Sequence, residues 1–239
     1  MNKLFSTEGH TVLLFGLISV AALSSGCWRG VSRQVLATVL SFHGDVAYQG
    51  SEQERSQPLT LETNPGSGSV LRTSGGGRAD LALIPGALLH ISSNSEVRIE
   101  ELRLTKNGNE TEDGMRARAA RVSLKRGSVT IVVERRDESE LRFAIGTIAG
   151  KLSADQDCVC QVHLDNGHGR VTCVRGKAYA AGTNSEPTTI KEGYFQKWPG
   201  GAIAPAEEDA RAQADVADTL EAARVLQQLQ LAQVNRRPR

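Results

Sequence analysis

The sequence has no excess of charge of either sign. Its 239 residues include 28 lysines and arginines against 27 aspartates and glutamates, a formal net charge of +1. Proteins that bind nucleic acid by neutralising phosphates present a broad basic face. The balance therefore argues against a nucleic-acid partner, and the short basic end over residues 236–239 is typical of a solvated terminus.

Aromatic residues are also scarce, at 4% of the chain, whereas there are 24 glycines. That combination favours many short strands joined by tight turns. It also leaves Trp198 nearly alone as a side chain on which a sugar ring could stack.

The apolar stretch near the N-terminus is too short for a comfortable membrane span. Thr11 to Ala22 is uncharged and apolar, whereas a spanning helix needs about 20 such residues. Lys3 precedes this stretch, and three small residues followed by Cys27 come after it. This is the anatomy of a secretory signal.

These residues resemble a bacterial lipoprotein signal with its lipobox. The resemblance implies that the signal is cut before Cys27 and that this cysteine is acylated on its sulfur and on its new N-terminus. Ser24 stands where leucine is usual, so an ordinary cleaved signal with a nearby cysteine is the alternative. Trp28 after the cysteine is similar to the pattern of lipoproteins sorted to the outer membrane. We therefore expect a signal peptide over 1–26, a lipidated N-terminus and linker over 27–34, and a lipid anchor on the periplasmic face of the outer membrane.

The segment 35–200 has the pattern of an all-β domain. Short stretches rich in Val, Ile, Leu and Thr recur from Val35 to Trp198, separated by clusters of Gly, Asn, Asp, Ser or Pro. This pattern predicts many short antiparallel strands in a sandwich or roll. Two polar, turn-rich segments, 50–69 and 105–117, are expected to be long surface loops.

Three consecutive glycines, Gly75 to Gly77, raise the question of a phosphate-binding loop. Such a loop needs Gly–Lys–Ser/Thr at the start of a helix whose amides face the phosphate. Here Arg78, Ala79 and Asp80 follow the glycines, and a strand pattern comes next. The glycines therefore predict a turn between strands.

Residues 70–99 resemble the core of FecR-type domains. Those domains combine an "I-x-T" strand, a glycine-rich bend, two further strands and a "pnS-x-v-x-l" segment. The positions that fill these places are Leu71, Thr73, Ala79 to Leu83, Gly86, Ser95, Val97 and Ile99, with a further strand–Gly–strand unit at Leu124 and Gly127. The likeness covers roughly Val39 to Trp198.

The sequence departs from the FecR pattern in three places. Pro85 occupies a turn that usually holds an Asp–Gly-like pair, and 153–155 replace a typical "rGT-x-F" motif. The N-terminal helical region of FecR regulators is missing. A lipid-anchored chain outside the cytoplasm is therefore not expected to control a sigma factor directly.

The densest cluster of reactive side chains lies over 158–173. If Asn166–Gly167 is a two-residue type I′ turn, Asp165 faces His168, Val162 faces Val171 and Cys160 faces Cys173. Cys158 then shares the face of Cys160, whereas His163 points to the other face. We expect a disulfide between Cys160 and Cys173, with buried thiols or a metal site as alternatives.

No other group of residues predicts chemistry. Histidines 43, 90, 163 and 168 are scattered, and each has the pattern of a surface or satisfied core group. The acidic residues near the strand end and the second loop are expected to be solvated: Glu100, Glu101, Glu110, Glu112 and Asp113. We predict no catalytic, metal or cofactor residues, and no enzyme.

The tail, 201–239, predicts a linker and one C-terminal amphipathic helix of about 25 residues from near Glu207. The predicted apolar stripe is Val216, Leu220, Ala223, Leu226 and Val234. Polar residues are placed on the other sides: Asp215, Asp218, Glu221 and Arg224. The stripe either packs on the β domain or meets a partner helix, for example in a homo-oligomer.

Together these features predict a lipid-anchored, non-catalytic binding or scaffolding protein. It would act through contacts with an unidentified envelope protein, in envelope signalling. A carbohydrate or cell-wall binder is the alternative, with Trp198 as its stacking side chain.

Overall fold

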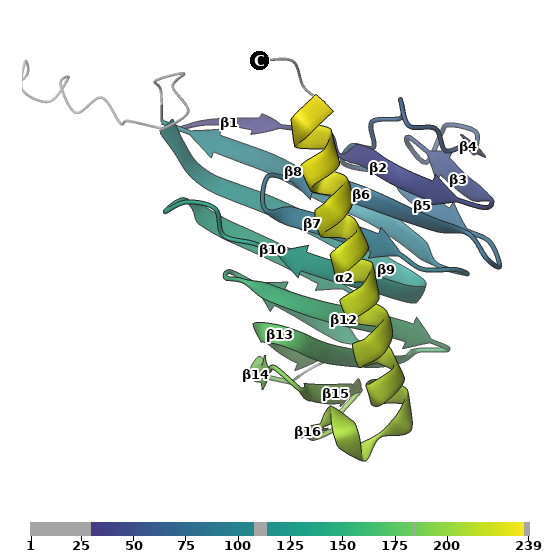
Figure 1. Ribbon diagram of the computed structural model, residues 1–239, viewed down its shortest axis with the longest axis vertical. Coiled ribbons are helices and arrows are strands. Elements are labelled where there is room, and N and C mark those ends of the chain that lie inside the picture. The colour runs from purple at the N-terminus through teal and green to yellow at the C-terminus, as the bar shows by residue number, and fades with distance from the viewer. Residues whose placement is uncertain (1–29, 108–113, 184, 237–239) are drawn as a thin grey trace, which may run out of the picture.

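The structure, a computed structural model, describes residues 30–107, 114–183 and 185–236. Within these ranges it contains 16 strands, one 3-10 helix and one long α-helix (Figure 1). The all-β prediction with a C-terminal helix is therefore confirmed. Cys27 lies outside the described residues, and no helix among those described is both long and apolar enough to cross a membrane.

The strands form two layers, which we call sheet A and sheet B. Strands of sheet A alone are β1 (Val31–Gln34), β3 (Val46–Gln49), β4 (Gln57–Pro58), β5 (Val70–Thr73), β8 (Glu96–Lys106), β10 (Glu140–Gly146), β11 (Gly150–Ala154) and β14 (Thr188–Lys191). Strands of sheet B alone are β2 (Thr38–His43), β6 (Arg78–Ile84), β7 (Ala87–Ile91), β12 (Cys158–Asp165), β15 (Tyr194–Trp198) and β16 (Ile203–Pro205). β9 (Met115–Val133) and β13 (His168–Gly182) belong to both.

Neighbours in sheet A follow the order β4-β3-β5-β8-β9-β10-β11-β13-β14, and β1 pairs with the far end of β8. Sheet B has the order β2-β6-β7-β9-β12-β13-β15-β16. All pairs are antiparallel except β9–β10, which is parallel. That pair departs from the predicted all-antiparallel pattern. β9 ends in sheet B, and the chain returns to sheet A before β10 begins, so the two strands run in the same direction.

β9 and β13 pass from one sheet to the other at glycines. Gly127 of β9 has φ +88°, and Gly176 of β13 has φ +72°. A Cβ atom on Gly127 would lie 2.2 Å from Oγ of Ser95, and one on Gly176 would lie 2.1 Å from the carbonyl oxygen of Asp157. Both bends therefore require glycine.

The main hydrophobic core lies between the sheets and is built from alternate residues of the strands, such as Leu81, Leu89 and Ile131 of sheet B and Ile99 and Leu152 of sheet A. Trp198 belongs to this core and is 2% exposed. Its ring packs so close to Gly150 and Gly169 that a Cβ at either would approach it within 2.9 Å. The expectation that Trp198 stacks on a sugar is therefore wrong, because the ring is buried between the two sheets.

The 3-10 helix η2 (Ala206–Glu208) and the helix α2 (Ala210–Arg236) follow β16. α2 runs back over the outer face of sheet B, toward the end of the molecule that holds β1 and β2 (Figure 1). Its Ala223 and Leu226 contact an apolar patch made by Leu40, Leu88, Val132, Val159 and Val174. The prediction that the helix packs on the β domain is confirmed.

The predicted stripe on α2 is partly wrong. Leu220 is 45% exposed, whereas Thr219 is fully buried. The face toward the sheet follows Ala212, Val216, Thr219, Ala223 and Leu226, with steps of four and three residues. Leu220 lies about 80° from the centre of that face. The side chain of Val234 lies outside the described residues.

Several expected boundaries also shift. Residues 31–34, expected in the linker, form β1 against β8. The predicted loop over 105–117 is shorter, because β8 runs to Lys106 and β9 begins at Met115. The glycine cluster is a turn, as predicted: N–H of Gly77 donates to the carbonyl of Ser74 at 3.0 Å, and β6 follows.

Candidate functional site: a polar row and cleft beneath α2

Strand register places six polar residues in one row across the outer face of sheet B. Each is the cross-strand neighbour of the next, and together they form what we call the polar row: Ser41, Asp80, His90, Thr130, Gln161 and Thr172. They come from six strands and lie beside the apolar patch that α2 covers. Asp80, Thr130, Gln161 and Thr172 are buried.

One end of the polar row is an Asp–His pair. Oδ1 of Asp80 lies 2.7 Å from Nδ1 of His90, and the hydroxyl of Ser41 donates to Oδ2 at 2.5 Å. The carboxylate therefore has both oxygens engaged, as a buried acid requires. A carboxylate on one ring nitrogen fixes the orientation of the imidazole. Sequence inspection missed this pair because the register of β6 and β7 shifts between Ala82 and Ile84, so counting from the turn does not place Asp80 opposite His90.

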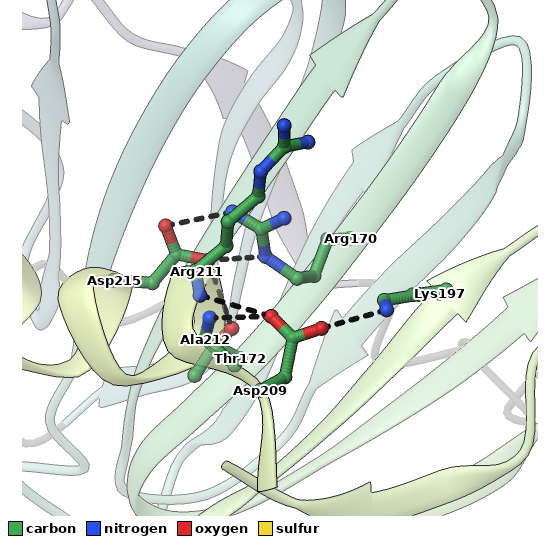
Figure 2. A network of polar contacts seen from close by, with 7 residues as sticks. All are labelled: Arg170, Thr172, Lys197, Asp209, Arg211, Ala212 and Asp215. Carbon is green, nitrogen blue, oxygen red and sulfur yellow. Dashed lines mark hydrogen bonds and ion pairs between the residues drawn. The ribbon is translucent and has the colours of Figure 1, made fainter. Parts of the chain in front are cut away.

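The other end of the polar row is tied to α2. Arg170 donates two hydrogen bonds to the carboxylate of Asp215, at 2.5 and 2.9 Å, and Thr172 donates a third at 3.2 Å (Figure 2). The Arg170 and Asp215 side chains are 11% and 13% exposed. The prediction that Asp215 lies away from the sheet is wrong, because it has the charge complementary to Arg170.

The start of α2 is fixed by Asp209. Its Oδ1 accepts hydrogen bonds from the backbone N–H groups of Arg211 and Ala212, both at 3.0 Å, and its Oδ2 lies 2.7 Å from Nζ of Lys197 (Figure 2). This is an N-cap reinforced by a charge. The Lys197 contact and then the helix amides lower the pKa of Asp209 to about 2.

A cleft of about 840 Å³ lies between the sheet and α2. Its floor includes His90, Thr130 and Gln161 of the polar row, together with a second polar set on the same strands: Ser128, His163 and Arg170. Asp215, Asp218 and Ala222 of α2 line the opposite wall. Burial lowers the pKa of His163, and the positive charge of Arg170 lowers it further.

Buried polar atoms without partners gather at this interface. Gln161 and Ser128 line the cleft, but Oε1 of Gln161 and Oγ of Ser128 are themselves buried, as is Oγ1 of Thr219 on α2; the described residues give none of these three atoms a hydrogen bond. Each such atom costs about 1–3 kcal/mol if it stays unpaired. The other two buried atoms without partners are Nε and Nη1 of Arg118, a residue outside this cleft whose Nη2 pairs with Asp137.

The cysteines lie on the opposite face of β12 and β13, in the main core. The predicted register is confirmed: Asn166 and Gly167 both have positive φ, and Cys160 pairs with Cys173. All three thiols are buried and free in the structure. Hydrogen bonds with Cys158 and Cys173, together with burial, raise the pKa of Cys160 well above its ordinary value. The Cys160–Cys173 bridge stays a prediction, and no group of three or more His, Cys, Asp or Glu residues in the described ranges is arranged to hold a metal.

A second, smaller groove of about 600 Å³ lies on the outer face of sheet A. Its floor includes the small residues Ala117, Ala119 and Ala144. Charged side chains rim it, and Glu101 pairs with both Arg103 and Arg121, at 2.9 and 3.3 Å. The groove is therefore a charged surface with a flat floor.

Comparison with known proteins gives one family. Residues 69–179 match the family described as FecR protein. The matched range begins later and ends earlier than the likeness expected over Val39 to Trp198. It includes β9 and every member of the polar row except Ser41. No curated protein matches the sequence.

Two solved structures of a candidate anti-sigma factor from Parabacteroides distasonis ATCC 8503, at 1.65 and 2.50 Å resolution, are similar to the chain. Both are 14% identical, with TM-scores of 0.38 and 0.39, and the match covers 56% of this chain and 57% of the other. The chain thus spans little more than half the length of those proteins. What the comparisons establish is that this chain contains a FecR domain, over residues 69–179.

Proposed function

We propose that this protein is a non-catalytic binding or scaffolding protein of the bacterial envelope. It is tethered by lipid on Cys27 and takes part in envelope signalling through contacts between the outer face of sheet A and another protein. The FecR domain supports the signalling role. The observation that carries the binding role is the difference between the two faces of the sandwich.

α2 covers the outer face of sheet B (Figure 1), whereas no element of the described chain lies over the groove on sheet A. The charges there are held in exposed pairs, such as Arg121 with Glu101 and Arg142 with Glu140. Exposed pairs of this kind are worth about 0–1 kcal/mol. A partner can therefore replace them with its own charges at little cost, and arginine is enriched at protein interfaces.

The alanine floor of the groove lets a partner backbone approach the sheet closely. Arg103 and Arg121 on one side and Arg142 and Lys151 on the other line the same groove. These cations exceed the nearby acids Glu101, Glu140 and Asp155. The groove therefore suits a segment of a partner protein with acidic side chains.

The proposed anchor keeps the domain at the membrane. Cys27 precedes Gly30, the first described residue, by three positions. Three extended residues span at most about 11 Å, so β1 would lie close to the bilayer surface.

The test is photo-crosslinking in the native envelope. A photoreactive residue at Arg121, in the groove, should give a reproducible protein adduct. The same residue at Arg224, 67% exposed on α2, is the matched control and should not. The double variant R121E/R142E, crosslinked from Lys151, should lose that adduct. Equal adducts from both positions, or an adduct that survives charge reversal, would reject the assignment of this face.

A further inference from the structure

Exposed apolar side chains gather at one edge of the sandwich. In the part of the chain that the structure describes, nine large apolar side chains are exposed. Five of them come from the first strands, from the segments that join those strands, or from the last two turns of α2: Val31, Leu36, Phe42, Leu61 and Leu231. Apolar residues scattered singly over a surface are ordinary, whereas a group on one surface marks a contact with a protein or a membrane.

We call this surface the N-terminal edge; it consists of β1 to β4, the segments 35–37 and 59–69, and the adjoining end of α2. β2 is the edge strand of sheet B, and β4 and β1 are edge strands of sheet A. No strand of the described chain pairs with their outer sides. The end of α2 reaches this edge, because Leu229 packs against the apolar patch that includes Leu40 of β2 (Figure 1).

Leu61 is held at the tip of a turn on this edge. N–H of Thr63 donates to the carbonyl of Thr60 at 3.2 Å, which places Leu61 at a central position of the turn. Leu59, two residues earlier, is buried in the main core and fixes the base of the segment. Turn positions usually hold Gly, Pro, Asn, Asp or Ser, yet this one presents a leucine that is 57% exposed.

Leu36 is held beside the same segment. N–H of Ala37 donates to the carbonyl of Pro65 at 2.7 Å, and a Cβ on Gly66 would lie 2.8 Å from Cδ2 of Leu36. Leu36 is nevertheless 62% exposed. The ordered backbone therefore presents both leucines outward, so they can enter an apolar phase without rearrangement of the fold.

The proposed tether enters the fold at this edge, since Cys27 precedes Val31, the first residue of β1, by four positions. The apolar side chains come from separate elements, and a fluid bilayer can receive them without the matched shape that a protein interface needs. Exposed charges on the edge have both signs, as in Arg33 and Glu62. These observations favour apolar contact with lipid over attraction to a charged partner.

We propose that the N-terminal edge rests on the phospholipid bilayer, with Leu36, Leu61 and Leu231 inserted at the level where the acyl chains begin. This inference rests on the proposed tether at Cys27 and adds an orientation to it. The sandwich stands on the membrane, with β15 and β16 at the end farthest from the lipid (Figure 1). The bilayer also covers sheet edges that would otherwise be open to pairing with other chains.

The test is photo-crosslinking of the purified, lipid-bearing protein in vesicles of phosphatidylethanolamine and phosphatidylglycerol. A photoreactive residue in place of Leu61 should give a lipid adduct, detected by mass. The same residue in place of Ile203 is the matched control and should give none. Ile203 is also an exposed apolar residue, at 36%, but it lies on β16 at the opposite edge of sheet B.

A second variant tests whether α2 shares this surface. With the photoreactive residue kept at position 61, L231D should remove most of the lipid adduct, because a carboxylate does not enter an apolar layer. Leu231 is 65% exposed, so L231D should keep the thermal stability of the parent. I203D, the control, should leave both the adduct and the stability unchanged.

The mass of the purified protein reports separately whether Cys27 carries acyl chains. If it carries none, the proposed tether is wrong and the orientation is rejected with it. If the acyl chains are present, three results overturn the orientation alone: no lipid adduct at position 61, equal lipid adducts at positions 61 and 203, or an adduct between two copies of the chain. The tether and the assignment of the groove on sheet A would then stand.

Discussion

Single glycines decide where the strands leave one sheet and enter the other. At Gly127 the backbone is left-handed and Ser95 fills the space where a side chain would begin. Gly193 has a similar φ, +79°, but nothing lies within 4 Å of the position of its Cβ. A side chain at Gly127 would therefore suffer both backbone strain and steric overlap, whereas one at Gly193 would suffer backbone strain alone.

We predict that G127A lowers the free energy of unfolding by about 2–4 kcal/mol, from left-handed strain plus overpacking against Ser95. G193A should cost only the strain, about 1–2 kcal/mol. Denaturant unfolding of both variants measures the difference. Equal losses would mean that Ser95 moves aside freely.

Asp209 is the residue on which the start of α2 depends. Replacing it with alanine should cost about 1 kcal/mol, the usual value of an N-cap. Because the pKa of Asp209 is lowered from 3.8 to about 2, its contribution is complete above pH 4 and is lost as the pH falls through 2. D209A should therefore reduce the loss of stability between pH 4 and pH 2. E221A, which removes an exposed partner of Arg224 on the same helix, should leave that acid profile as it is in the parent.

The cysteine pair is a further residue-scale prediction. The confirmed register puts Cys160 opposite Cys173, and an oxidising compartment permits the bond. Mass mapping of unreduced peptides from native envelopes should find this link. Two free thiols, or a Cys158–Cys173 link, would contradict it.

Residue-scale features were predictable only where they are local in sequence. Asn166–Gly167 fixed its hairpin because both partners lie within a few residues of the turn. The polar row was not predictable, since its six members come from six strands and become neighbours only through the register of the whole sheet. Even within the β6–β7 hairpin, counting back from the turn would place Leu81 opposite His90, and only the bulge between Ala82 and Ile84 brings Asp80 there.

At the scale of elements, α2 shows how a sheet selects the face of a helix. Periodicity alone favoured Leu220, the more apolar choice. The sheet beneath that half of the helix carries Arg170 and Thr172, and these bind Asp215. Thr219, four residues further along the same face of the helix, is therefore turned toward the sheet and buried. The existence of the helix was predictable from composition, whereas its rotation depends on residues elsewhere in the chain.

Two leucines of α2 test this rotation directly. L226A should lower stability by about 2–4 kcal/mol, because Leu226 is fully buried against the apolar patch. L220A should change it by no more than about 0.5 kcal/mol, since that side chain is largely in solvent. Thermal unfolding of the two variants provides the comparison. Similar losses of stability from both would contradict this rotation of α2.

At the scale of the whole molecule, the proposed lipid anchor on Cys27 would decide where the protein works. Changing Cys27 to serine should block processing and move the protein from the membrane fraction to the periplasmic fraction. A C160S variant, which keeps Cys27, is the control and should fractionate like the parent. If C27S also stays with the membrane at its mature size, an ordinary signal and another mode of attachment replace the lipoprotein interpretation.

The path of α2 has a consequence for biosynthesis. The strands are added across the sandwich broadly in chain order, from β1 and β2 at one end to β15 and β16 at the other, and α2 then returns over them (Figure 1). Leu40 and Leu88 are made early, yet the residues that cover them, Ala223 and Leu226, are made among the last. A nascent chain therefore exposes this patch until α2 has been made, and for that interval we expect it to be bound by chaperones that hold apolar surface.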